Sequence, residues 1–464
     1  MESSLNAHAE RLPQQWAASM HAVATTNGTG WLPSLRAAAA RELLKNGLPG
    51  NKDEAWKYTS LRRLEQLREI DGKPTVASAA ADAQDWNTPL AGFEGYGFGF
   101  RCGSLHWLEQ AAPEGVILST FRDAVTGLMD DGHERLRRML EAVDFSGRSR
   151  AFAALNTALL DQGVVIHVAA GVDGGTCLAQ WAQADGRISR LANFRLIVLL
   201  EEGARLNLLE QHLSMQGQVA VEPPSSSGGQ GLNLVMQADL GKNAQLHHFR
   251  VQQDADNSVL LTFSDVYQAA DSTYTYAGID IGGGLVRHDL YCRLAGPGAR
   301  AELNGAFVLD GERLVDHHIC VDHEAPACSS EQFFRGVLGG SSRGVFNGKA
   351  LIRPGADGSR VRQSNANLLL SDLAEMDTKP ELEIYADEVE ASHGATVGQL
   401  DEQAVFYLRS RGLAKADARR MLTTAFCRAV SSRISDLALG EQIAGLLDAA
   451  VSGLNIVEEN SNAA

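Results

Sequence analysis

The sequence is poor in aromatic residues, in proline and in paired cysteines. Aromatic side chains make up only 6% of the 464 residues, and 12 prolines stand against 46 glycines. This composition favours many tight turns and small-residue stacking over an aromatic core. The 6 cysteines are scattered and form no Cys-x-x-Cys pair, which excludes a disulfide framework and a zinc-finger spacing.

Long apolar runs and excess positive charge are missing as well. The longest aliphatic run, 196–200, is far too short to span a bilayer, and the first residues show neither the basic nor the apolar segment of a secretory leader. The 41 Lys and Arg against 57 Asp and Glu give a formal net charge of −16. Because phosphate backbones and anionic lipids attract clustered Lys and Arg, we expect no nucleic acid and no membrane as partner. A reducing cytoplasm is the predicted location.

Helices are predicted at both ends of the chain. The segments with helical apolar spacing are 32–48, 60–70, 132–143, 150–160, 401–434 and 437–451. Residues 74–92 indicate a linker, and the last ten residues look frayed. We therefore predict an N-terminal helical domain with linker at 1–160, a core at 161–400 and a C-terminal helical domain at 401–464.

From about residue 164, short runs alternate apolar and polar residues, as half-buried strands do. Similar turns begin at Gly203, Gly241, Ala270, Gly298 and Ala327, at intervals of 38, 29, 28 and 29 residues. This period predicts a solenoid in which each coil covers the apolar face of the last.

The predicted fold class is mainly β, a right-handed parallel β-helix flanked by N-terminal and C-terminal α-helical domains. An antiparallel sandwich with irregular hairpins is the alternative. The string VEPPSSSGGQG at 221–231 is expected to form a surface loop that lengthens one coil.

Motifs for nucleotide and acyl chemistry are missing. The string nearest to a phosphate-binding loop, GVFNGKAL, has only three residues between Gly344 and Gly348 and has Ala350 after Lys349. No Gly-x-Ser-x-Gly elbow occurs, and the glycines at 282–284 lack a dinucleotide fingerprint. We therefore expect no nucleotide to bind this chain directly.

The densest group of metal-type side chains is in the string HHICVDHEAPAC. Its members are His317, His318, Cys320, Asp322, His323 and Cys328. In a strand the even-numbered positions 318 to 322 share one face, while 317 and 323 lie on the other, so a site for a soft or borderline metal needs a turn. The alternative is histidines stacked along a solenoid face beside a buried thiol. His247, His248 and His288 are interpreted likewise, as hydrogen-bonded imidazoles.

A second candidate is His393, which lies between Ser392 and Gly394 after an acidic stretch at 387–390. The glycine is expected to let the backbone turn and to present the imidazole at a strand end. An imidazole beside carboxylates can exchange protons or bind a metal near neutral pH. A purely structural turn is the other interpretation.

Three strings are similar to those of a known family. They are DEAWKYTSLRRL, GVFNGKALIRPGADGSRVRQSNANLLLS and TKPELEIYADEVEASHGATVGQLDEQAVFYLRSRG. Together they resemble the SufB/SufD family, the scaffolds of the Suf iron–sulfur cluster assembly machinery, and the SHGAT and LEIYAD strings favour its SufD branch. The resemblance extends from about Asp53 to Leu447 and is strongest between Gly336 and Gly412.

The resemblance implies the same β-helix between helical domains, in a non-catalytic scaffold that pairs with a SufB-like paralogue and docks a SufC ATPase on its C-terminal domain. ATP hydrolysis would belong to SufC, and a transient iron–sulfur cluster or iron would be shared with the partner subunit. At the matching SHGAT position, His393 is the implied ligand of iron or of the nascent cluster. Phe406, Tyr407 and Met421 are the implied SufC contacts. A homodimer is a further state open to the isolated chain.

One departure from the family concerns thiols. Several relatives carry a cysteine two positions before this histidine, where the chain has Ala391. A lone imidazole is a poor permanent cluster site because stable clusters take several thiolates, but shared between two subunits it suits a transient one. Two other functions stay open from the residues, a polysaccharide-acting enzyme on a β-helix and a purely structural solenoid. The missing leader and the few aromatics weigh against the enzyme.

Overall fold

The computed structural model describes most of the chain. The described residues are 12–25, 30–67, 69–71, 95–101, 104–108, 110–127, 130–184, 190–215 and 230–454. Three expectations fall on other residues: the linker at 74–92, the loop at 221–231, of which only 230 and 231 are described, and the frayed last ten residues.

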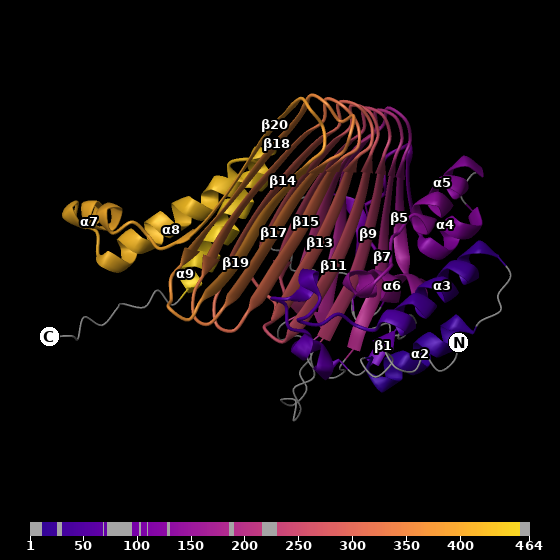
Figure 1. The fold of residues 1–464 in the computed structure, drawn as a ribbon, viewed down its shortest axis with the longest axis horizontal. Helices are drawn as coiled ribbons and strands as arrows, with labels where there is room; N and C mark the ends of the chain where they lie inside the picture. The colour runs from indigo at the N-terminus through magenta and orange to yellow at the C-terminus, as the bar shows by residue number, and fades with distance from the viewer. Residues whose placement is uncertain are drawn as a thin grey trace.

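Two long sheets face each other and form a solenoid (Figure 1). Sheet A contains, in spatial order, β19 (Glu375–Ile384), β17 (Arg343–Ile352), β15 (Leu314–His323), β13 (Leu285–Leu294), β11 (Ser258–Gln268), β9 (Gln230–Leu240), β7 (Arg190–Leu200), β5 (Gly163–Val168) and β4 (Val116–Thr120), with β1 (Glu69–Asp71) paired to β7. Sheet B contains β20 (Val389–Gly398), β18 (Ser359–Leu369), β16 (Ser329–Leu338), β14 (Arg300–Leu309), β12 (Thr273–Asp280), β10 (Gln245–Gln253), β8 (Arg205–Met215), β6 (Asp173–Ala184), β2 (Tyr96–Arg101) and β3 (Ser104–Trp107). From β5 onward, successive strands alternate between the sheets, so each coil adds one strand to each sheet.

Strands of successive coils pair in parallel and in register. In β14 and β16, for example, Phe307 lies opposite Gly336, about one coil further along the chain. Among the described strands, only β2 with β3 and β4 with β5 pair antiparallel, at the N-terminal end. The predicted parallel β-helix between helical ends is therefore confirmed, and the antiparallel sandwich is wrong. Parallel neighbours need a long crossover, which the strand in the facing sheet supplies.

The repeated turn between the sheets places one residue per coil in the left-handed conformation. Gly203, Asn243, Asp271, Gly298 and Ala327 have φ angles of 69°, 58°, 58°, 74° and 58°. Glycine adopts this conformation freely, and Asn and Asp tolerate it. The N–H of each donates to a carbonyl of the next coil at 2.8 to 3.2 Å, so the ladder continues through the turn. The recurring turns predicted from the sequence are therefore real, although only some of them use glycine.

Inward-facing side chains stack in columns and form the main core. Close packing disfavours a side chain at some inward positions: a Cβ on Gly278 would lie 2.2 Å from the Tyr276 hydroxyl, and one on Gly305 would lie 2.2 Å from the Phe334 ring. Part of the glycine excess therefore comes from close packing inside the solenoid and not from turns.

Helices of the N-terminal part cover the outer face of sheet A (Figure 1). They are α2 (Gln14–Ala24), α3 (Trp31–Asn46), α4 (Phe121–Gly127), α5 (Asp130–Glu141) and α6 (Ala151–Ala158), with the 3-10 helices η1 (Glu54–Trp56), η2 (Leu61–Gln66) and η4 (Arg148–Arg150). Their apolar side chains pack against Leu191, Val259 and Leu261 of the sheet. The helices predicted at 32–48, 132–143 and 150–160 are confirmed to within a few residues.

The segment 60–70 differs from the predicted helix. It contains the 3-10 helix η2 and then β1, which pairs in parallel with β7. Leu61, Leu64 and Leu67 are three residues apart, a spacing that aligns side chains on one side of a 3-10 helix. Leu64 and Leu67 are accordingly buried.

The string DEAWKYTSLRRL fastens the N-terminal part to the middle of sheet A. The Arg287 guanidinium lies 3.7 Å from the centroid of the buried Trp56 ring, and the Thr59 hydroxyl donates to the buried Asp316. Burial acts to raise the pKa of Asp316, but Arg287, His318 and Thr59 outweigh it and lower that pKa to about 2. This string therefore has a structural role.

The C-terminal helices are α7 (Glu402–Ser410), α8 (Lys415–Ser431) and α9 (Leu437–Gly453). The last two cover the outer face of sheet B, whereas α7 lies away from the solenoid (Figure 1). Met421 and Ala425 of α8 are exposed, because the helix turns another face to the sheet. That face carries Ala418, Thr423, Cys427 and Val430. No helix in the described part of the chain is long and apolar enough to cross a membrane.

Candidate functional site

The middle of the solenoid contains buried ionisable side chains. On β8, the Glu210 carboxylate lies 2.5 Å from His212 Nε2 and 2.8 Å from His248 Nε2, and all three residues are at most 2% exposed. Burial acts to raise the pKa of Glu210, but the hydrogen bonds from both histidines outweigh it and lower that pKa. The Nε2 atoms of His212 and His248 are therefore hydrogen-bonded to Glu210 and are not available to another ligand.

A second set of buried ionisable side chains surrounds Asp280 on β12. Its carboxylate lies 2.9 Å from His288 Nε2, 3.1 Å from His317 Nε2 and 3.9 Å from Arg250. Burial acts to raise the pKa of Asp280, but His288, Arg250 and His317 outweigh it and hold that pKa well below its usual range. Burial and the nearby Arg250 lower the pKa of His288 to about 3. We call the whole set the buried histidine cluster; its members are Glu210, His212, His248, Arg250, Asp280, His288 and His317.

The sequence identified only part of this cluster. The interpretation of His248 and His288 as hydrogen-bonded imidazoles is confirmed, but the carboxylates of Glu210 and Asp280 were missed. One signal was present: in LNLLEQHL, the alternation that buries Leu208 places Glu210 in the same inward row. A charged residue in an apolar row requires a buried partner.

The histidine-rich string on β15 is divided between two faces, as the alternation predicts. His317 lies inside the solenoid, its ring centroid 5.1 Å from that of His288, whereas His318 is partly exposed with Nε2 3.0 Å from Asp316. The string therefore does not converge on one position. Within the described ranges, no group of three or more His, Cys, Asp or Glu side chains could hold a metal ion.

The described cysteines are free and are Cys177, Cys292, Cys320, Cys328 and Cys427. Burial raises the pKa of every one of these thiols, to about 12 for Cys320 and Cys427. Metal ligation needs the thiolate, and a thiol with a raised pKa stays protonated at neutral pH. The described part of the chain therefore offers no ready thiolate ligand.

His393 lies in the middle of β20, so the predictions of a strand end and of a structural turn are both wrong. The following glycine lies inside the same strand and makes no turn; a Cβ on Gly394 would meet no atom within 4 Å, on the face of β20 opposite to the imidazole. The acidic stretch is not beside the ring either. Asp387 and Glu388 precede β20, and Glu390 pairs with Arg360 at 3.6 Å.

The strands β19 and β20 form the terminal rung of the solenoid. Each is the last strand of its sheet, so among the described strands both have a free edge. In sheet A, Ile352 is 0% exposed, but Ile384, the next residue in its column, is 41% exposed. In sheet B, Gln363 is buried and the next residue in its column, His393, is exposed. The imidazole makes no hydrogen bond or ion pair with any described residue.

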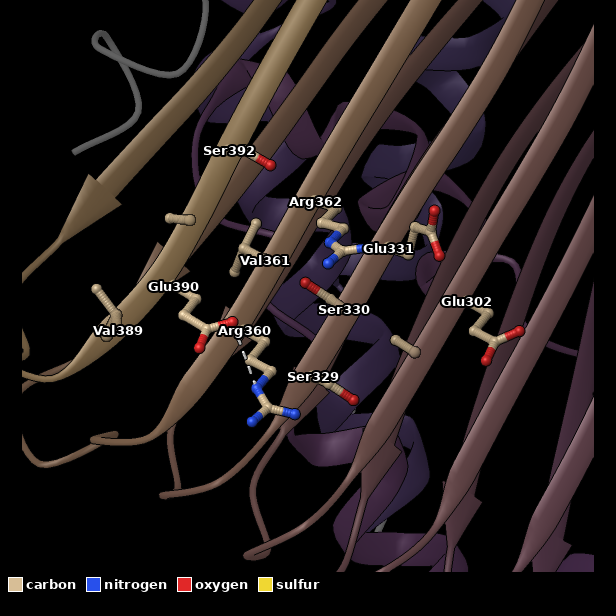
Figure 2. A pocket seen from close by; sticks show the side chains of 12 residues that line it. Glu302, Ser329, Ser330, Glu331, Arg360, Val361, Arg362, Val389, Glu390 and Ser392 are labelled. Atoms are coloured by element: carbon tan, nitrogen blue, oxygen red, sulfur yellow. Dashed lines mark ion pairs between the residues drawn. The ribbon is translucent and has the colours of Figure 1, made fainter.

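A hollow of about 660 Å³ lies on the outer face of sheet B near β20 (Figure 2). Arg360 and Glu390 pair across it, and Arg362 on β18 lies opposite Ser392 on β20. Its lining carries charges of both signs. Because side chains alternate along a strand, Ser392 and His393 occupy opposite faces of β20, and the hollow is a separate feature from the imidazole.

The predicted partner contacts lie on the C-terminal helices. Phe406 and Tyr407 on α7 are 70% and 57% exposed, and Met421 on α8 is 50% exposed. The two helices pack against each other. Large apolar side chains exposed together on neighbouring helices are typical of an interaction surface. His393 belongs to a different element, so the chain has two separate candidate sites.

Comparison with known proteins identifies the class. Residues 182–426 match the family model for the SufBD core domain of SUF system FeS cluster assembly. An iron–sulfur cluster assembly SufBD family protein of Synechocystis, slr0076, is 28% identical over 420 residues, which cover 87% of each chain. The iron–sulfur cluster assembly protein SufD of Escherichia coli is 26% identical over 443 residues, 93% of this chain and 94% of its own. The chloroplastic protein ABCI7 of Arabidopsis thaliana is 27% identical over 425 residues, 89% of this chain and 84% of its own. Since the matched core domain spans more than half of the 464 residues and most of the solenoid, the chain belongs to the SufBD family of iron–sulfur cluster assembly proteins, as a SufD-like member.

Proposed function

We propose that this chain is a non-catalytic scaffold subunit of the Suf machinery. It pairs with a SufB-like paralogue, docks a SufC ATPase, and shares a transient iron–sulfur cluster or iron with the paralogue at His393. The observation that carries the proposal is the position of this histidine, an exposed imidazole without a partner among the described residues, on the last strand of the solenoid.

The terminal rung is the proposed pairing surface. Both of its strands have free edges, which can accept the main-chain hydrogen bonds of another strand. Exposed apolar side chains accompany them: Ile384 is 41%, Tyr385 61% and Val397 43% exposed. The end of a second β-helix would cover these residues and continue both sheets. A second copy of this chain presents the same edges, so the isolated chain can pair with itself by the same surface.

The protonation of the thiols supports a shared site. Stable clusters are held by several thiolates, and the described cysteines are thiols with raised pKa values, four of them buried and Cys320 partly buried. His393 therefore supplies one ligand, and the remaining ligands come from the paralogue. Iron and cluster are cargo here, and weak, divided ligation lets the cluster leave for its final acceptor.

The helices α7 and α8 are the proposed SufC docking surface. Phe406, Tyr407 and Met421 supply its apolar contacts. The chain lacks a phosphate-binding loop motif, so ATP hydrolysis would come from the docked subunit. We place the complex in the cytoplasm and keep a division at 1–160, 161–400 and 401–464, which is supported by β5 beginning at Gly163 and α7 at Glu402.

The substitution His393→Ala in the full chain, co-expressed with the paralogue and the ATPase, tests the proposal. We expect the subunits to co-purify as in the wild type, while bound iron and reconstituted cluster fall by about tenfold or more, because a lost ligand costs at least as much as a lost outer-shell contact. His106→Ala is the control, since His106 is an exposed histidine on β3. It should leave iron and cluster unchanged.

Other outcomes have distinct meanings. Wild-type iron and cluster formation in His393→Ala would remove this residue from the mechanism. Dissociation of the subunits would assign it to the pairing contact instead. If neither a SufB-like paralogue nor a SufC-like ATPase co-purified with the wild-type chain, the scaffold proposal would be rejected.

A further inference from the structure

Four buried amide side chains lie in the last coils, behind His393. They are Gln332 on β16 and Gln363, Asn365 and Asn367 on β18, and none is more than 5% exposed. Strand register places Gln332, Gln363 and His393 in one column on successive coils. Neighbouring strands are about 4.8 Å apart, so Gln363 is the next side chain behind the imidazole.

The two asparagines satisfy each other. Asn367 Nδ2 donates to Asn365 Oδ1 at 2.6 Å, and the Thr378 hydroxyl donates to the same oxygen at 2.8 Å. Asn367 Nδ2 also donates to the carbonyl of Thr396 at 3.1 Å. These amides are therefore fully engaged within the protein.

In the two glutamines, only the amide nitrogen has a hydrogen-bond partner. Gln363 Nε2 donates to the carbonyl of Gly348 at 3.1 Å, and Gln332 Nε2 donates to the carbonyl of Lys349 at 3.3 Å. Only the amide nitrogen can donate to a carbonyl, so these bonds fix which end of each amide is which. Both Oε1 atoms are buried and accept no hydrogen bond in the described part of the chain. A buried acceptor without a donor is destabilising and favours any donor that can reach it.

We infer that Gln363 is the positioning residue of His393: its free Oε1 accepts the N–H of the imidazole nitrogen that does not bind iron. The inference rests on the proposed function, in which His393 is an iron ligand. A histidine that binds a metal commonly donates its second ring N–H to an oxygen acceptor, which fixes the tautomer and the ring orientation. The imidazole has no hydrogen-bond partner among the described residues, and Gln363 carries the nearest unused acceptor in its column, so the bond would form when the ring is oriented by iron. Gln363 thereby leaves the other ring nitrogen free to bind iron at the open end of the solenoid.

Gln332 offers a matched control within the same column. It has the same side chain, the same bond from Nε2 to a carbonyl of β17 and the same unused Oε1, but it lies one coil further from His393. A general effect of removing a buried amide should appear at both positions. An effect transmitted through the imidazole should appear only at Gln363.

Titration of Fe²⁺ into the anaerobic assembled complex tests the assignment. We expect Gln363→Met, which keeps the side-chain length but removes the oxygen acceptor, to weaken Fe²⁺ binding by about 10-fold to 100-fold. Gln363→Glu keeps an acceptor oxygen but loses the bond to the Gly348 carbonyl, so it should bind Fe²⁺ more weakly than the wild type and more tightly than Gln363→Met. Gln332→Met should bind Fe²⁺ as the wild type does.

A spectroscopic measurement reports on the hydrogen bond itself. In the full complex labelled with ¹⁵N-histidine and loaded with Zn²⁺ as a diamagnetic probe, the signal of His393 is identified by its loss in His393→Ala. We expect its ring N–H to be protected from solvent exchange in the wild type and in Gln332→Met, and to exchange rapidly in Gln363→Met. A packing role for Gln363 would not change this exchange.

Equal loss of Fe²⁺ affinity in Gln363→Met and Gln332→Met would overturn the assignment, as would Fe²⁺ binding by Gln363→Glu that is no tighter than by Gln363→Met. Wild-type affinity in Gln363→Met combined with loss in His393→Ala would reject the positioning role and leave the proposed function intact. Wild-type iron binding in His393→Ala would reject both.

Discussion

The buried histidine cluster in the middle of the solenoid and His393 at its end place the same side chain in opposite environments. In the middle, His288 and His317 each lie within 3.1 Å of the Asp280 carboxylate and are at most 4% exposed. At the end, His393 is exposed and has no partner among the described residues. A histidine bound to a carboxylate in a dry interior contributes to stability and cannot take up cargo, whereas an exposed one is available to it. The difference arises because each coil covers the one before it, and among the described strands none follows β19 and β20 to cover the terminal rung.

The largest expected difference in stability is between lysine substitutions at two isoleucines of one column, Ile352 and Ile384. Ile352→Lys places an ammonium group in the closed part of the solenoid and should destabilise the chain by more than about 5 kcal/mol, so that little soluble protein is recovered. Ile384→Lys, one coil later, should change the free energy of unfolding by less than about 1 kcal/mol, yet weaken pairing with the paralogue. Urea unfolding and co-purification measure the two effects.

Ile352→Ala provides a version of the inner substitution that can still fold, with an expected loss of about 2–5 kcal/mol. Equal destabilisation by Ile384→Lys and Ile352→Lys would mean that the terminal rung is covered in the isolated chain, contrary to the proposed pairing surface.

A smaller difference in the free energy of unfolding is expected between alanine substitutions at two aspartates, Asp280 and Asp256. Asp280→Ala removes a buried carboxylate and leaves Arg250, His288 and His317 without it, so we expect a loss of about 3–5 kcal/mol in the free energy of unfolding. Asp256 is paired with Arg313 at 2.8 Å, but its side chain is 74% exposed, so Asp256→Ala should cost less than about 1 kcal/mol. Similar losses in the two variants would show that the cluster does not stabilise the fold.

The smallest effect, counted per pH unit, is a dependence of stability on pH. Burial lowers the pKa of His288 to about 3 and that of His323 to about 4. Between the usual histidine value of about 6.5 and these values, the unfolded chain binds protons that the folded chain does not. The free energy of unfolding should therefore fall as the pH falls from about 6.5 toward 4, by at most about 1.4 kcal/mol per pH unit for each histidine.

Urea unfolding at a series of pH values measures this slope. His323→Gln should reduce this slope by the contribution of one histidine, because glutamine does not titrate. A slope that stays the same in the variant, or stability that rises on acidification, would contradict the expectation.

Much of the fold could be predicted from local patterns. Alternation along strands and the recurrence of turns predicted the solenoid, and helical spacing predicted the segments at both ends, since both patterns depend only on which residues face an apolar core. The same alternation predicted that His317 and His318 would lie on different faces, which β15 confirms. Helical spacing did not decide which face of α8 packs on sheet B, because the apolar residues of this helix allow more than one buried face.

The candidate site was less accessible from the sequence. Residue chemistry alone left a structural turn open at His393, and the resemblance to the SufB/SufD family singled it out. The partners of Glu210 could not be identified, because His248 lies about a coil away and coil length varies from 28 to 38 residues. A shift of one residue in strand register exchanges inward and outward faces. The column that joins Gln363 to His393 was hidden for the same reason.

The sequence by itself determined the β-helix with helical ends, the scatter of the cysteines and the family. These follow from period, composition and motif, which are properties of the chain in one dimension. Only the tertiary structure decided which histidines are bound to carboxylates and that His393 has no partner among the described residues. The physical reason is that burial depends on whether another coil follows; in the described part of the chain β20 is the last strand, so the imidazole of His393 stays in contact with solvent.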